Sequence, residues 1–216
     1  MIFVCGSQFP SNPDESFRFI MGQRIGEPVD EKSDIHTMLL HGGSADVEIV
    51  QNPTMANEAL FRGELFFGVY SQITTDAAVK LLTIVKEALS ERQRRIVIVA
   101  HSHGSIIVKC VLDQLAQLEL CDHLRIVTLG PAQTIYHPKF ENRMRNFHFN
   151  SDFTRMLDAG NWITHPFKDQ LHKHHELMDD TVGLGFDFLV KQHAAEEYLK
   201  HVQVESCIRL FCLVDQ

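Results

Sequence analysis

The sequence of 216 residues lacks the features that mark several classes of protein. No apolar run approaches the roughly 20 residues that a helix needs to cross a bilayer, so we expect no transmembrane segment. Basic charge is scarce, and the formal net charge is −8. Because phosphate binding requires a basic face, this charge argues against nucleic acid as a partner. The first residues also lack the basic and long apolar regions of a signal peptide.

Cysteine is sparse and has no recognisable spacing. The five cysteines are odd in number and scattered, and no C-x-x-C occurs. This pattern favours reduced thiols over a disulfide framework. We therefore expect a cytoplasmic protein, with export by a non-classical route left open as the alternative.

The remaining composition is that of an ordinary globular protein. Hydrophobic residues make up 44% of the chain and charged residues 22%. This length suits one domain with a substantial core. We expect a single domain over residues 1–216.

The most informative stretch is residues 95–109, RIVIVAHSHGSIIVK. A short apolar run ends at Ala100, Ser102 stands between two histidines, and Gly104 precedes an apolar segment with helical spacing. This order predicts a buried strand, a sharp turn with Ser102 at its tip, and a helix. The residues two before and two after such a serine must be small, as Ala100 and Gly104 are. The N–H of His103 would then lie at a helix N-terminus, where it can stabilise an oxyanion.

The sequence A-H-S-H-G resembles the G-x-S-x-G nucleophile elbow of the α/β-hydrolase superfamily, in its lipase/esterase-like branch, with Ala in place of the first Gly. This resemblance implies a mostly parallel sheet flanked by helices, and a catalytic order of Ser, acid and His along the chain. The expected fold is therefore of the α/β class, a compact three-layer α/β/α sandwich.

The neighbouring segments favour the same class. A helix is expected over 74–91, with Thr75-Asp76 able to cap its start, and a second over 105–120 follows the strand at 96–99. This succession continues with a buried strand at 124–129. Strands that alternate with helices in this way form βαβ units, which predicts parallel pairing. Further strands are expected at 2–5, 47–51 and 145–150. A helix is expected at 186–202, and its buried residues include Ala195, Tyr198, Leu199 and Val202. The segment 207–214 is expected to be a strand or a packed helix end.

The acid of the triad is expected after a strand that follows the nucleophile. Asp152 comes directly after the strand at 145–150, and its task would be to hold the imidazole through an Nδ1–H hydrogen bond. A turn aspartate that caps the next segment is the alternative interpretation. Asp158, in the same loop, is the second candidate for the acid.

The histidine is harder to choose, because the chain has 13 of them. His193 is our first choice: it precedes A-A-E-E-Y-L, which resembles the H-x-x-x-x-Y-L pattern after the catalytic histidine of some lipase-like members. His175 ranks second and His165 third. We expect His101 and His103 to line the pocket or pack under the turn, because neighbouring side chains at a tight turn point elsewhere than at Ser102.

A second oxyanion donor is expected from the turn after the first strand. The resemblance implies an H-G-x type sequence there, and the equivalent is Cys5-Gly6-Ser7, with the Ser7 N–H as donor. An ordinary strand-to-helix turn is the alternative. His41-Gly42-Gly43 is a competing candidate, which we rank second and interpret as a glycine turn after an irregular segment at 38–40.

A metal site is the alternative chemistry. The segment 172–180 combines imidazoles and carboxylates, which zinc or another transition metal can bind. Its spacing matches no H-E-x-x-H arrangement, and a solvated polar loop explains it equally well. The members of this cluster are His172, His174, His175, Glu176, Asp179 and Asp180.

The sequence therefore predicts a serine hydrolase that cleaves a carboxylic ester or thioester through Ser102, His193 and Asp152 and needs no metal or organic cofactor. The expected partner is a small-molecule or lipid-like ester. Two alternatives remain: an inactive binding protein with the hydrolase fold, and a metal-dependent hydrolase that uses the 172–180 loop. The acyl chain and the oligomeric state are not specified by the sequence.

Overall fold

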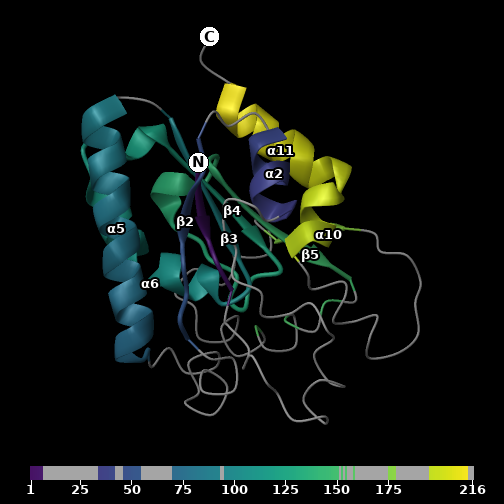
Figure 1. Cartoon of the computed structure of the whole chain (residues 1–216), viewed down its shortest axis with the longest axis horizontal. Coiled ribbons are helices and arrows are strands. Elements are labelled where there is room, and N and C mark those ends of the chain that lie inside the picture. Colours follow the sequence, from purple (N-terminus) through teal and green to yellow (C-terminus); the bar gives the residue numbers. More distant parts are fainter. Residues whose placement is uncertain are drawn as a thin grey trace.

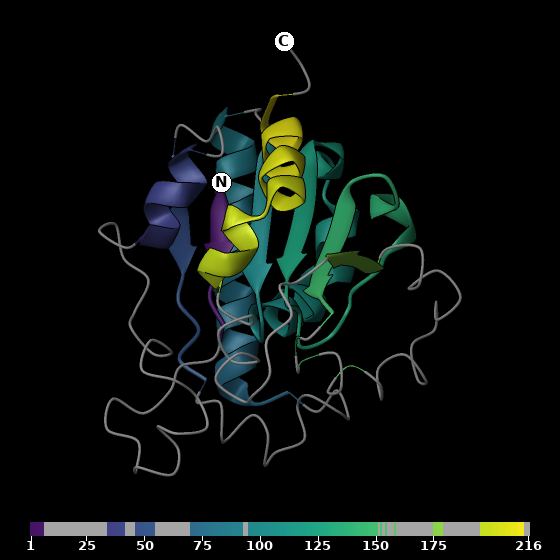
Figure 2. The same ribbon diagram turned by 90° about the vertical axis from the view of Figure 1, so that its right-hand side faces the viewer.

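The computed structural model describes residues 1–6, 34–41, 46–54, 70–92, 95–150, 152, 154, 158, 175–178 and 195–213. These residues form an α/β fold built on one parallel sheet (Figures 1 and 2). The sheet has six strands in the order β2-β1-β3-β4-β5-β6, and every neighbouring pair is parallel. The strands are β1 (Ile2–Val4), β2 (Glu48–Val50), β3 (Ile96–His101), β4 (Leu124–Leu129), β5 (Met144–Phe149) and β6 (His175–Met178).

The prediction of a mostly parallel sheet is thus confirmed, and five of the strands lie where the sequence places them. The sixth is a correction. Residues 175–178 pair with β5, whereas the sequence suggested a polar loop over 172–180. The segment H-E-L-M shows no clear alternation of polar and apolar residues, so only its tertiary pairing reveals it as a strand.

The order of the strands places a topological switch point at β1. β1 has β2 on one side and β3 on the other, so the direction in which the chain adds strands reverses at β1. In open parallel sheets, ligands bind beyond the carboxyl ends of the strands at such a switch point. The register pairs Val4 with Ala100. The turns that follow β1 and β3 therefore leave the sheet side by side.

Helices pack on both faces of the sheet (Figure 1). The long helix α5 (Gln72–Arg92) and α6 (Gly104–Gln117) cover one face, and α2 (Asp34–His41), α10 (Ala195–Lys200) and α11 (Val202–Leu213) cover the other. Alternate residues of β3 supply both cores: Ile98 faces α5 and α6, and Val99 faces the other three helices. Complete burial of such a side chain contributes about 1.5–3 kcal/mol.

Three details of the helices differ from the sequence predictions. Residues 34–41 form α2, where an irregular segment was expected around 38–40. α5 is capped by Ser71, whose Oγ accepts the Thr74 N–H at 3.2 Å, and not by Thr75-Asp76. Val202 is 68% exposed, although the sequence predicted it to be buried, because the chain bends at His201 between α10 and α11.

No helix among the described residues is long and apolar enough to cross a membrane.

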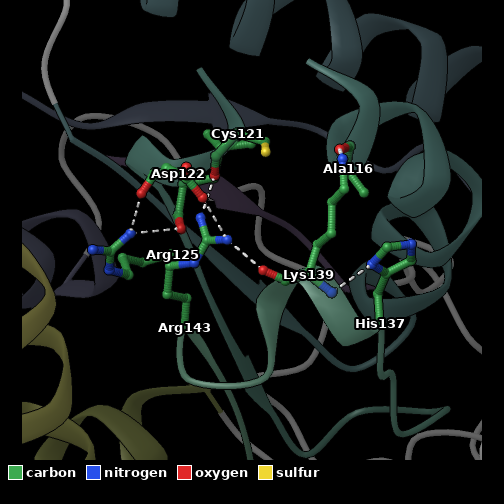
Figure 3. A network of polar contacts seen from close by, with 8 residues as sticks. Ala116, Cys121, Asp122, Arg125, His137, Lys139 and Arg143 are labelled. Atoms are coloured by element: carbon green, nitrogen blue, oxygen red, sulfur yellow. Dashed lines mark hydrogen bonds and ion pairs between the residues drawn. The ribbon is translucent and has the colours of Figure 1, made fainter. Parts of the chain in front are cut away.

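A polar network fastens the edge of the sheet at which β4 and β5 begin (Figure 3). The Arg143 guanidinium donates to the Cys121 carbonyl at 2.6 Å and pairs with Asp122 at 2.9 Å. Lys139 Nζ donates to the carbonyl of Ala116 in the last turn of α6 at 2.9 Å. These contacts hold two short 3-10 helices, η1 (Cys121–His123) and η2 (Pro138–Phe140), at the edge opposite to the carboxyl ends of the strands.

Candidate active site

Ser102 has the backbone conformation of a nucleophile elbow. Its φ angle is +52°, and among the described residues no other amino acid except glycine has a positive φ. Holding a non-glycine residue in this left-handed region costs of order 1–3 kcal/mol, and such strain concentrates at functional sites. Ser102 follows β3 and stands two residues before α6, as the sequence predicts, and its side chain is partly exposed.

Four hydrogen bonds hold the strained turn. The Ser102 N–H donates to the Leu129 carbonyl at 3.0 Å, which extends the pairing of β3 with β4. The Ser102 carbonyl accepts the Ser105 N–H at 3.0 Å, the Ser105 hydroxyl at 2.8 Å and the Ala132 N–H at 3.1 Å. The loop after β4 therefore fixes the turn from one side, and the first turn of α6 fixes it from the other.

The small residues that flank Ser102 permit close packing. Ala100 is fully buried. A Cβ placed on Gly104 would lie 2.5 Å from the Val4 carbonyl oxygen and 2.9 Å from that of Cys5. Only glycine allows α6 to start this close to the end of β1.

Gly6 lies directly beside the turn. A Cβ added to it would lie 3.1 Å from the Ser102 Cβ and 3.1 Å from His101 Nδ1. The turn after β1 thus reaches the candidate nucleophile. Ser7, the residue predicted to supply that donor, lies outside the described residues.

The competing candidate, His41-Gly42-Gly43, falls between α2 and β2 in the sequence. His41 ends α2, and the chain must then reach the amino end of β2 at Glu48. Because all strands are parallel, the amino end of β2 lies opposite to the carboxyl ends of β1 and β3. Gly42 and Gly43 lie outside the described residues, and His41 is at the edge away from Ser102.

His103 packs beneath the turn. It is 1% exposed, and its Nδ1 lies 3.0 Å from the Asn52 Nδ2. The Asn52 Oδ1 accepts the Thr54 N–H at 3.0 Å, which orients the amide so that Nδ2 faces the imidazole. The imidazole Nδ1 is therefore an acceptor, and the ring proton is on Nε2. The hydrogen bond between Asn52 and His103 had no sequence signal.

Asp152 is held as an oriented carboxylate just beyond β5. It is 3% exposed, and its Oδ1 accepts the Thr154 N–H at 2.8 Å and the Thr154 hydroxyl at 2.7 Å. Its Oδ2 accepts the hydroxyl of Tyr198 from α10. Hydrogen-bond donors on both oxygens therefore fix the orientation of the carboxylate.

Asp158, the second candidate for the acid, has different neighbours. Both of its oxygens accept from Thr134, one from the N–H at 2.9 Å and the other from the hydroxyl. The Thr134 hydroxyl also lies 3.2 Å from the buried His148 Nε2. These bonds attach Asp158 to the loop after β4, which itself holds the Ser102 turn, and give it a structural task.

Two groups near the site, the half-buried Lys109 and the buried Cys5, have shifted pKa values. Burial lowers the pKa of Lys109 on α6, an effect that the nearby carboxylate of Asp158 opposes. Lys109 donates to the Gln133 Oε1 at 2.8 Å. Burial also raises the pKa of the Cys5 thiol to about 12, so this cysteine is neutral at physiological pH and is a poor nucleophile.

The predicted histidines cannot all be placed. His193 and His165 lie outside the described residues, as do His172, His174, Asp179 and Asp180 of the suggested metal cluster. His175 opens β6, and no group of three metal-ligating side chains occurs among the described residues. The structure therefore brings together Ser102, Gly6 and the N-terminus of α6, and it joins Asp152 to Tyr198.

Comparison with known proteins adds no further constraint. The chain matches no protein-family model, and a search of curated proteins found no match.

Proposed function

We propose that the protein is a serine hydrolase that cleaves a carboxylic ester or thioester, with Ser102 as nucleophile. The observation that carries this proposal is the left-handed backbone of Ser102 at the carboxyl end of β3, directly before α6. A strained serine at the sheet's switch point and at a helix N-terminus is the arrangement that nucleophilic acyl transfer requires. We also propose that the whole chain forms one cytoplasmic domain with the compact three-layer α/β/α hydrolase fold.

The reaction would proceed through an acyl-enzyme. As the Ser102 Oγ bonds to the carbonyl carbon, its proton passes to the imidazole of His193, and the carbonyl oxygen becomes an oxyanion. Collapse of this intermediate breaks the bond to the leaving group, which takes the proton from the imidazolium. Water then attacks the acyl group by the same route and restores the serine. No metal or organic cofactor takes part.

The choice of His193 gains support from α10. Tyr198 bonds to Asp152, so α10 is docked beside the proposed acid. His193 precedes the first residue of α10, Ala195, by two positions, which limits the distance between their Cα atoms to about 7 Å. In Figure 2, α10 lies nearer than α11 to the edge towards which the strand arrows point, which is the edge of Ser102.

The oxyanion would be held by the N–H groups of His103 and Ser7. His103 precedes α6 with its side chain fixed by Asn52, and the adjacent helix N-terminus favours negative charge. Gly6 brings the chain that leads to Ser7 against Ser102. Loss of one such donor costs about 3 kcal/mol of transition-state stabilisation. The expected substrate is a small-molecule or lipid-like ester.

A fluorophosphonate probe tests this proposal without knowledge of the substrate. We expect the probe to label the wild-type protein at Ser102, and Ser102→Ala to abolish labelling. Ser90→Ala is the matched control, because Ser90 is exposed on α5 away from the site. A panel of p-nitrophenyl esters then tests turnover. If the wild type and Ser102→Ala are equally unlabelled and hydrolyse every ester at the background rate, the enzymatic proposal is wrong and the inactive binding protein is the better description.

A further inference from the structure

We infer that Tyr198 is a positioning residue of the proposed reaction, because its hydroxyl joins the triad acid to the helix that follows the triad histidine. This inference rests on the proposed function and extends it to a residue on α10 that the mechanism does not otherwise use. Tyr198 is completely buried, and its hydroxyl contacts the carboxylate of Asp152 and the backbone of Phe149.

The direction of the tyrosine hydrogen bond is determined by its neighbours. The Phe149 N–H can only donate, and it donates to the Tyr198 hydroxyl oxygen at 3.1 Å. The hydroxyl proton is consequently available for the Asp152 Oδ2, which can only accept when the acid is ionised. The ring is held as well, since its centroid lies 4.5 Å from that of Phe149.

The other oxygen of Asp152 has a different role. Oδ1 accepts both donors of Thr154, at 2.7 Å and 2.8 Å. A carboxylate oxygen has two lone pairs, so an imidazole Nδ1–H that binds this carboxylate is expected to approach Oδ2, beside the tyrosine. Tyr198 would therefore set the position of the oxygen that orients the histidine.

The tyrosine also acts on the histidine through the chain. Tyr198 fastens the first turns of α10 to the end of β5, and His193 lies five positions before Tyr198 in the sequence. In the proposed triad, one hydroxyl would thus relate the acid, and the helix that follows the histidine, to the same point of the sheet. Because misplacement of reacting groups by about 1 Å can cost roughly 100-fold in rate, this contact should control kcat more than substrate binding.

Kinetics of Tyr198→Phe test the inference. We expect kcat for a p-nitrophenyl ester to fall roughly 10- to 100-fold, with KM within about twofold of the wild type. Tyr136→Phe is the matched control: it removes another tyrosine hydroxyl, whose charged neighbour is Glu141 by η2, at the opposite edge of the sheet. An unchanged kcat in Tyr198→Phe, or an equal loss in Tyr136→Phe, would overturn the inference. Absence of probe labelling and of turnover in the wild type would instead refute the proposed function.

A spectroscopic measurement decides the matter if Tyr198→Phe does not fold. The chain has three tyrosines, so a Tyr70→Phe, Tyr136→Phe protein grown with 3-fluorotyrosine has a single fluorine probe, at Tyr198. We expect its ¹⁹F resonance to shift on Asp152→Asn and again when the fluorophosphonate reacts with Ser102. A resonance that moves with neither change contradicts the inference. A shift with Asp152→Asn alone shows a structural bond without a link to the nucleophile, and overturns it as well.

Discussion

The backbone of Val4 packs so closely against Gly104 that it leaves no room for a side chain there: a Cβ on Gly104 would lie 2.5 Å from the Val4 carbonyl oxygen. The contact joins the start of α6 to the end of β1. It therefore fixes the distance between the Ser102 turn and the turn that contains Gly6.

Gly104→Ala should separate these two turns. Either the backbone of β1 or the first turn of α6 must move, since the nearest atoms belong to the main chain. We expect a loss of about 1–3 kcal/mol in the free energy of unfolding and a loss of probe labelling at Ser102. Urea denaturation and labelling measure the two effects. Gly130→Ala is a useful comparison, because Gly130, unlike Gly104, has a positive φ and follows β4. Equal labelling of Gly104→Ala and the wild type would contradict the expectation.

Substitutions of Ser102 should reveal the strain in its backbone. At φ +52° glycine is relaxed and alanine is not, so Ser102→Gly should be more stable than Ser102→Ala by about 1 kcal/mol. Thermal unfolding of the two variants measures this difference. The same pair of substitutions at Ser90, inside α5, should have the opposite order, because alanine is favoured over glycine there by about 1 kcal/mol. The same order at both sites would show that Ser102 is not strained.

Substitution of Asp152 should mainly reduce kcat, whereas substitution of Asp158 should mainly reduce stability. Asp152→Asn should reduce kcat strongly, by a factor that approaches roughly 10⁴ for a triad acid. Asp158→Ala removes the acceptor of the Thr134 N–H and one of the two partners of its hydroxyl, the other being His148. It should therefore lower the free energy of unfolding by about 1–3 kcal/mol and leave kcat of the folded protein within about tenfold. Ester kinetics and urea denaturation of both variants test this. The reverse pattern would transfer the role of the acid to Asp158.

Stability should fall at alkaline pH because of Cys5. Its pKa is about 12 in the folded protein against 9.0 for an ordinary thiol, so above pH 9 the unfolded chain loses a proton that the folded chain keeps. The Cys5 contribution is fully present below pH 9 and is lost as the pH rises towards 12. Between pH 9 and 10 this loss amounts to about 1 kcal/mol. Urea denaturation should show a smaller loss in Cys5→Ala than in the wild type; the loss that remains comes from Cys207 and Cys212, whose pKa values burial also raises. Identical slopes would refute the burial of the Cys5 thiol.

Much of the fold followed from local patterns. The strands at β3, β4 and β5 and the helices α5 and α6 are strongly periodic or bounded by clear breakers, and they were predicted close to their observed limits. β6 was missed because its four residues show no clear alternation. α2 was missed because its helical spacing, Ile35, Met38 and Leu39, covers only eight residues. The exposure of Val202 was not predicted because a bend at His201 changes which residues face the core. No glycine or proline in the sequence indicates this bend.

Part of the candidate site could be predicted from the sequence, and part could not. Ser102 could be predicted because an elbow imposes small residues at fixed positions on either side of it. The contacts of Asn52 with His103 and of Tyr198 with Asp152 join residues 51 and 46 positions apart, and no local pattern encodes them. The sequence ranked Asp152 above Asp158 only because Asp152 directly follows a strand. Their different hydrogen-bond partners had no sequence signal.

The parallel pairing of β1 with β3 also bears on how the protein folds. Ile2 pairs with Ile98, so the two turns that meet at Ser102 come from parts of the chain almost a hundred residues apart. Closing so long a loop makes folding slow, because its entropy must be lost before the contacts form. A fragment with β3, the turn and α6 would lack the Val4 carbonyl against which Gly104 packs. Nucleophilic reactivity at Ser102 should therefore appear only in the last, concerted step of refolding and can serve as a reporter of complete assembly.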